Sequence, residues 1–318
     1  MSAVSSPTIP EVRRLSVLDG ALGPALGAAL ADPAVAEILV NADGAVWIDR
    51  AGEGLVATGA YMAAHDREAV IRLLAHAAGE TVGPDQPLLS ASLPGSAARV
   101  QAVLPPLASA PVLAIRRRPA RIHTLDDYVE AGIAAPGQAA ALRGALAARR
   151  NIIVAGGAGS GKTTLLNALL AEPCMAGGRL IVLEDTPELQ VSGANTVQLL
   201  TRRADPHVTL RDLVQVALRL RPDRIIVGEV RDGAALDVLK AWNTGHPGGL
   251  LTLHANSAQD AMSRLEDLCL EAQAASPQRL IASAVGLIVF IARTPAGRRI
   301  TGLLDLKTTT HPTKGDLE

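Results

Sequence analysis

A glycine-rich stretch between an apolar run and a leucine-rich run carries the clearest chemistry in this sequence. Its residues match the phosphate-loop pattern G-x-x-x-x-G-K-[ST] at every fixed position: Gly156, Gly157, Ala158, Gly159, Ser160, Gly161, Lys162 and Thr163. Glycines allow positive φ, and successive loop N–H groups with the start of a helix form an anion site. We therefore predict that this loop, together with Thr164, binds the phosphates of ATP. Lys162 would reach the β- and γ-phosphates, and Thr163 would ligate Mg²⁺.

Polar side chains recur directly after three other apolar runs that we predict to be buried strands. Glu184 follows the run 180–183, Glu229 follows 224–227, and His254 follows 249–253. Strands that alternate with helices predict a mostly parallel sheet, which binds ligands at the carboxyl ends of its strands. We therefore expect these three side chains to gather around the phosphate loop.

Each of these groups suits a step of phosphoryl transfer. Glu229 would hold the Mg²⁺ shell, through a metal-bound water because glutamate is longer than the aspartate usual there. A carboxylate of the segment 184–188, which offers Glu184, Asp185 and Glu188, would orient and deprotonate the attacking water, and we favour Glu184 because it directly follows the strand. A neutral His254 or His246 could detect the γ-phosphate by forming a hydrogen bond with it. The alternative for each group is an ordinary solvated loop or a structural histidine.

The surrounding pattern predicts two domains. Residues 1–15 read as a flexible tail, and 16–118 as a smaller α+β domain of helices mixed with hairpins. A basic, proline-containing stretch suggests a linker at 119–123. Residues 124–318 alternate strands and helices and end in a hairpin near Thr294–Gly297, which predicts an α/β domain around the phosphate loop.

Composition restricts the class of protein. The chain is 48% hydrophobic but only 2% aromatic, and its net charge is −1, so neither nucleic acid nor an anionic membrane is a predicted partner. Cys174 and Cys269 lack metal-ligand spacing and suggest reduced thiols in a cytoplasmic protein. The most apolar run, 280–292, is shorter than the roughly 20 residues of a membrane-spanning helix.

The polar segments together resemble the ATPases of type II and type IV secretion systems. GGAGSGKTT, LEDTPELQ, VGEVRD and GHPGGLLTLHANS are similar, in order and spacing, to the Walker A, Asp box, Walker B and His box of that superfamily. The stretch LADPAVAEILVNADGAVWIDRAGEG and the chain length resemble the conjugal-transfer TrbB branch most.

The resemblance implies properties that the residues alone do not. It implies a PAS-like N-terminal domain, a RecA-like C-terminal domain and a homohexameric ring. The ring would serve inner-membrane secretion or conjugation subunits and associate with the membrane through them. It also implies arginines that approach the γ-phosphate from the N-terminal domain. Arg99 and Arg116 match those positions, and Arg117 is the fallback.

Other functions are less well supported. The runner-up is a pilus-assembly ATPase of the tight-adherence or type II kind. A RecA-like helicase or recombinase would need stacking aromatics, and the chain has only two Trp, two Tyr and one Phe. A non-hydrolysing nucleotide switch would not need two acidic segments. Neither the N-K-x-D motif of GTPases nor an ABC signature is present.

Overall fold

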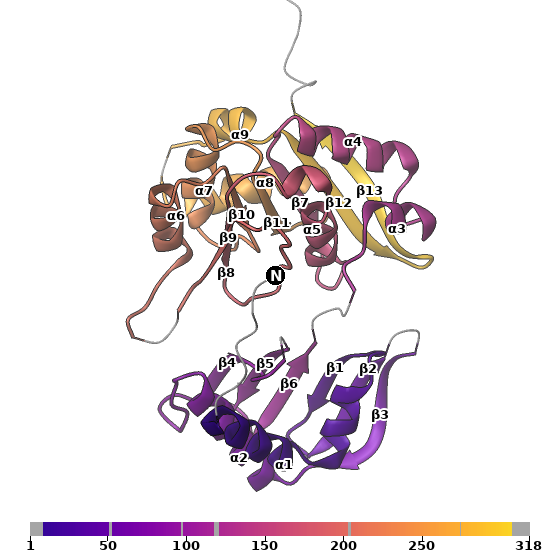
Figure 1. Cartoon of the computed structure of the whole chain (residues 1–318), viewed down its shortest axis with the longest axis vertical. Coiled ribbons are helices and arrows are strands. Elements are labelled where there is room, and N and C mark those ends of the chain that lie inside the picture. Colours follow the sequence, from indigo (N-terminus) through magenta and orange to yellow (C-terminus); the bar gives the residue numbers. More distant parts are fainter. Residues whose placement is uncertain are drawn as a thin grey trace, which may run out of the picture. The chain divides into compact units, whose positions relative to one another are not determined.

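The computed structural model describes residues 9–50, 53–96, 98–117, 121–202, 205–273 and 275–306, with side chains from residue 16 onward. The chain divides into two compact units, Met1–Ala120 and Arg121–Glu318. Each unit has its own sheet (Figure 1). Each unit also buries its own hydrophobic side chains. Residues 119 and 120 of the predicted linker at 119–123 lie outside the described residues.

Unit 1 is an antiparallel sheet with strand order β3-β2-β1-β6-β5-β4. Side chains alternate along β5 and β6 between buried and partly exposed, because only one sheet face packs on the core with α1 and α2. In chain order its elements are α1 (Ile9–Ala31), β1 (Val35–Val40), β2 (Ala45–Arg50), β3 (Gly54–Tyr61), α2 (Ala64–Ala77), β4 (Leu88–Ser92), β5 (Arg99–Val103) and β6 (Val112–Arg116).

Three features of unit 1 differ from the sequence prediction. Helix α1 begins at Ile9, within the predicted tail, and it is kinked where Gly23 has φ 72° before Pro24. Strands β3 and β4 were not predicted. Both lie at sheet edges, where half-buried strands show little hydrophobic contrast in the sequence.

Unit 2 is a seven-stranded sheet with the order β13-β12-β7-β11-β10-β8-β9. All of its neighbouring strands are parallel except the β12–β13 pair. Its strands are β7 (Ile152–Gly156), β8 (Leu180–Glu184), β9 (Thr196–Leu200), β10 (Arg224–Val227), β11 (Leu250–His254), β12 (Leu287–Thr294) and β13 (Gly297–Asp305). The predicted hairpin is confirmed, with β13 at the edge of the sheet.

Helices cover both faces of this sheet, so its central strands are buried on both sides and are continuously apolar (Figure 1). The helices are α3 (Leu125–Glu130), α4 (Pro136–Ala147), α5 (Lys162–Leu170), the short 3₁₀ helix η1 (Pro173–Met175), α6 (Leu210–Arg219), α7 (Ala234–Asn243), α8 (Ala258–Leu270) and α9 (Gln278–Ala284). Helix α6 begins with a capping box, since Thr209 and Asp212 each accept from the other's backbone N–H.

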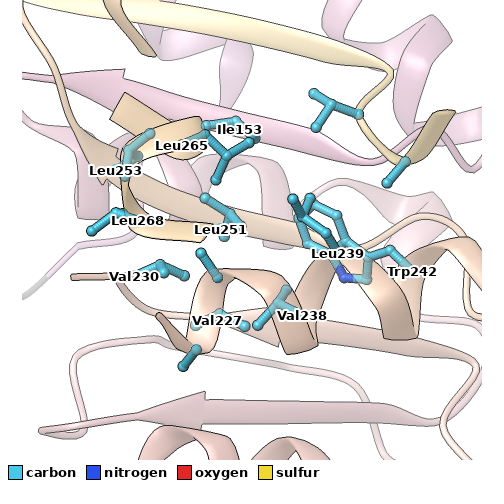
Figure 2. Packing of buried hydrophobic residues seen from close by; sticks show 14 of the residues in the cluster. Ile153, Val227, Val230, Val238, Leu239, Trp242, Leu251, Leu253, Leu265 and Leu268 are labelled. Atoms are coloured by element: carbon cyan, nitrogen blue, oxygen red, sulfur yellow. The ribbon is translucent and has the colours of Figure 1, made fainter. Parts of the chain in front are cut away.

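The core of unit 2 is aliphatic, as its composition requires. Figure 2 shows Ile153, Val227 and Leu251 of the sheet packed among side chains of α7 and α8, with Trp242 the large aromatic. Alternate strand residues, such as Ile152 and Val154, face α3, α4 and α5 on the other side. Two packed faces fix the register of the strands and therefore the positions of the polar residues at their ends. Among the described residues, no helix is both long and apolar enough to cross a membrane.

Candidate nucleotide-binding site

The phosphate loop connects β7 to the first turn of α5. Gly161 caps the helix with φ 101°, and Gly159 also has a positive φ of 65°. Any other residue would be strained at either position. A side chain at Gly156 would overlap the carbonyl oxygen of Ile291 in β12. The loop sequence is therefore set partly by backbone conformation and partly by the close approach of a neighbouring strand.

Lys162, in the first turn of α5, is buried, and its ammonium group lies over the loop. Its Nζ donates to the carbonyl of Gly157 at 2.9 Å and lies 3.3 Å from both ring nitrogens of His254. The register of β11 and β7 aligns His254 with Gly156, which places the histidine beside the loop. A positive charge and a row of loop N–H groups thus share one small region.

His254 connects Lys162 to the acidic end of β10. Its Nε2 lies 3.0 Å from Oε1 of Glu229. The ring thus lies between the ammonium group of Lys162 and the carboxylate of Glu229, and Oε1 of Glu229 has no hydrogen-bond partner among the described residues. Burial, and then the charge of Lys162, lower the pKa of His254 below its ordinary value, although Glu229 acts in the opposite direction. Burial and the charge of Lys162 therefore favour the neutral ring.

Glu184, at the end of β8, is buried with 3% of its surface exposed. Its Oε1 accepts the backbone N–H groups of Glu188 and Leu189, each at 2.8 Å. Gly228 leaves it room, since a Cβ there would lie 3.1 Å from Cγ of Glu184. This carboxylate therefore shapes the acidic loop that follows its own strand.

Three residues that sequence reasoning did not select also organise this edge of the sheet. Asn167 of α5 accepts from the N–H of Gln190 at 2.8 Å, which fastens the acidic loop to the phosphate-loop helix. Arg231 donates to Oε2 of Glu229 at 2.6 Å, and this hydrogen bond is the main cause of its raised pKa. Thr252 donates to the carbonyl of Gly228 at 2.6 Å. The polar Asn167 in the leucine-rich helix KTTLLNALL was a signal that could have been used.

The GHPGG segment lies at the amino ends of the parallel strands, whereas the phosphate loop lies at their carboxyl ends. It precedes β11, whereas the loop follows the parallel strand β7. His246 contacts the carbonyl of Ala241 at 3.2 Å, and a side chain at Gly249 would overlap Trp242. Of the two histidines that the sequence offered for the γ-phosphate, His254 lies beside the phosphate loop and His246 does not. The two glycines serve packing, as Gly248, with φ 85°, also lies against the buried Arg224.

Arg99 and Arg116 are directly opposite each other on β5 and β6 of unit 1. Arg116 also pairs with Glu37 at 3.4 Å, and its side chain is 62% exposed. Arg117 instead donates to the carbonyls of Asp32 and Val35. These bonds tie Arg117 to the start of β1, whereas Arg116 is paired with Glu37.

The site has features that fit a phosphate group and Mg²⁺. The buried hydroxyl of Ser160 in the loop has no hydrogen-bond partner among the described residues, and Thr163 stands in the first turn of α5. Lys162 supplies positive charge, and Glu229 supplies oxygen ligands of the kind that Mg²⁺ prefers. ATP with its metal is therefore compatible with the residues present.

A glycine-rich loop between a central parallel strand and a helix, with lysine in the first turn, defines a phosphate-loop nucleotide-binding protein of the α/β class. Residues 28–297 match the family of type II/IV secretion system proteins. The chain belongs to this family.

Individual relatives agree with this assignment. The conjugal transfer protein TrbB of Rhizobium radiobacter is 46% identical over 93% of this chain and 91% of its own length. The VirB11 ATPase of the Brucella suis type IV secretion system, solved with sulphate, is 28% identical, with a TM-score of 0.50 over 95% of this chain and 98% of its own. The Legionella pneumophila ATPase DotB shares the fold, with a TM-score of 0.59 and 19% identity over 93% of this chain and 81% of its own.

Proposed function

We propose that this protein is an ATP-hydrolysing motor of a type IV secretion or conjugal DNA transfer apparatus. The observation that carries the proposal is the contact series Lys162–His254–Glu229 beside the phosphate loop. It connects the group that would bind the γ-phosphate to the group that would hold the metal shell. The 46% identity to a conjugal transfer protein favours this role over a pilus-assembly ATPase.

The residues of the chain have distinct tasks in this proposal. Lys162 and the N–H groups of the loop bind and neutralise the phosphates, and Thr163 and Glu229 hold Mg²⁺. Bound Mg²⁺ would supply further stabilisation of negative charge on the phosphate oxygens. His254 is placed to exchange its contact with Lys162 for one with the nucleotide, and so to report the presence of the γ-phosphate to Glu229.

The water-orienting carboxylate belongs to the acidic loop. The sequence favours Glu184, but Oε1 of Glu184 already accepts two backbone N–H groups. We therefore propose Glu188, which is only half-buried, as the group that orients the water, with Glu184 holding the loop in place.

The proposal also includes the type of each domain and the assembly of the chains. Unit 1 would be a PAS-like domain and unit 2 a RecA-like domain, and six copies would form a ring in the cytoplasm. The ring would work with inner-membrane components of the secretion apparatus. Arg99 and Arg116 stay predicted arginines for the γ-phosphate, to be tested by alanine substitution of each in ATP hydrolysis assays.

Substitution of the phosphate-loop lysine tests the function directly. Lys162→Ala should lower the rate of ATP hydrolysis by about 100-fold or more, since one charge-stabilising donor is lost. Lys240→Ala, which removes an exposed lysine of α7, should hydrolyse ATP like the parent. The proposal is wrong if the two variants have equal activity, or if the purified parent hydrolyses no ATP with Mg²⁺.

Light scattering with and without ATP and Mg²⁺ tests the ring. A mass near six chains with nucleotide is the expected result, and a monomer in every condition would contradict the hexamer.

A further inference from the structure

We propose that Arg231 is a positioning residue that holds the carboxylate of Glu229 in its working orientation; this inference rests on the proposed ATPase function. Arg231 follows Glu229 by two residues in the loop after β10. No step of the mechanism above uses it. Its contacts nevertheless lie within the acidic edge of the site.

The two oxygens of Glu229 face two different segments, and Arg231 holds one of them by a hydrogen bond. Nη2 of Arg231 donates to Oε2 at 2.6 Å, and Nε2 of His254 lies 3.0 Å from Oε1. The hydrogen bond from Arg231 restricts the side-chain rotation that the glutamate would otherwise retain, since Oε1 of Glu229 has no hydrogen-bond partner among the described residues. A charge-assisted bond of 2.6 Å is also at the short end of the range for these pairs.

The backbone on either side of Glu229 is already fixed. The hydroxyl of Thr252 donates to the carbonyl of Gly228 at 2.6 Å, and the carbonyl of Thr252 accepts from the N–H of Val230 at 3.1 Å. Thr252 is 1% exposed, so these bonds are shielded from water. With the backbone held by β11, the remaining freedom of Glu229 is in its side chain, where Arg231 acts.

Charge explains why an arginine is suited to this position. Strands β8 and β10 are adjacent and parallel, so the acidic loop and Glu229 emerge at the same edge. The carboxylates of Asp185 and Glu188, as well as Glu229, attract Arg231 electrostatically. Without the guanidinium, these carboxylates would repel one another, and Glu229 would turn away from the loop toward solvent.

The experiment compares Arg231→Ala and Arg231→Lys with Arg211→Ala. Arg211 pairs with Asp237 at 2.8 Å, and its side chain is 48% exposed against 50% for Arg231. It therefore controls for the loss of an equally exposed ion pair outside the site. Steady-state kcat and KM for ATP with Mg²⁺, nucleotide affinity and thermal midpoint are measured for each variant.

Arg231→Ala should lower kcat by about 10–100-fold and change KM for ATP less than about threefold. A loss of this size is typical when a residue that orients a metal ligand is removed. Arg231→Lys keeps the charge and should stay within roughly fivefold of the parent. Arg211→Ala should match the parent, and all three should melt within about 2 °C of it, because exposed ion pairs contribute little to stability.

A double-mutant cycle separates positioning from a direct contact with substrate. If Arg231 acts through Glu229, adding Arg231→Ala to Glu229→Gln should change the residual single-turnover rate by less than about twofold. An unchanged kcat in Arg231→Ala overturns the inference, as does a loss confined to KM or a full additive loss in the cycle. When Lys162→Ala is inactive and Arg231→Ala is as active as the parent, only this inference fails. When Lys162→Ala is as active as the parent, the proposed function fails first.

Discussion

The backbone N–H of Glu188 donates to the side chain of Glu184 at 2.8 Å, so two acidic residues four positions apart have different environments. Glu184 is buried and accepts hydrogen bonds, whereas Glu188 is half-buried and faces the charge of Arg231. The fold therefore gives the two carboxylates different environments, one that accepts backbone hydrogen bonds in the core and one that is partly open to solvent.

Removal of the Glu184 carboxylate should destabilise the protein. Glu184→Ala leaves the N–H groups of Glu188 and Leu189 without this acceptor, and we expect the free energy of unfolding to fall by about 2–3 kcal/mol. Glu188→Ala should change it by less than about 0.5 kcal/mol. Urea unfolding followed by circular dichroism measures both values, and equal effects would contradict the structural role of Glu184.

Amide substitutions at the same two positions assign the water-orienting carboxylate. Glu184→Gln retains a carbonyl oxygen for the two N–H groups, so stability should be largely kept. Glu188→Gln should lower kcat by about 100-fold, and Glu184→Gln by less than about tenfold. The reverse order of the two kcat values would return the role to Glu184.

Asn167 should be needed for the contact between the acidic loop and α5. Asn167→Ala removes the acceptor for the N–H of Gln190 in a site that is 4% exposed, and we expect a loss of about 1–3 kcal/mol in the free energy of unfolding. Asn243→Ala, at an exposed helix end, is the matched control and should be neutral. A neutral Asn167→Ala would show that the loop is held without this side chain.

Two adjacent glycines of the phosphate loop should respond differently to alanine. A methyl group at Gly156 meets the carbonyl of Ile291 and the hydroxyl of Ser160, whereas one at Gly157 meets nothing within 4 Å. Gly156→Ala should therefore cost about 1–3 kcal/mol, as overpacking does in other cores, and Gly157→Ala less than about 0.5 kcal/mol. Thermal or urea unfolding compares them without nucleotide, and equal stability would refute the close approach of β12.

The two thiols should differ in reactivity. Cys174 is exposed, whereas Cys269 is buried and burial raises its pKa to about 11. The thiolate is the reactive form, so at pH 8 a maleimide should label Cys174 alone in the folded protein and both thiols in urea. Mass spectrometry counts the adducts, and Cys174→Ser should abolish native labelling. Rapid labelling of Cys269 in the native state would contradict its burial.

The sequence alone determined much of the candidate site. The phosphate-loop pattern, the β-branched run before it and the leucine spacing after it identify the strand, the loop and α5. Polar residues after apolar runs identify Glu184, Glu229 and His254 as strand-end groups, because a parallel sheet brings those ends to one edge. Edge strands β3 and β4 were missed, since partial burial leaves a weak pattern.

Only the tertiary structure decided which side chains are partners. The strand order β7-β11-β10-β8 is not the order of the chain, so the sequence does not reveal that His254 lies between Lys162 and Glu229. It also does not show that Glu184 holds its own loop, or that His246 lies at the far edge of the sheet. The local pattern of the sequence shows at which end of its strand a residue lies. Which residues touch one another depends on the pairing of strands that are far apart in the chain.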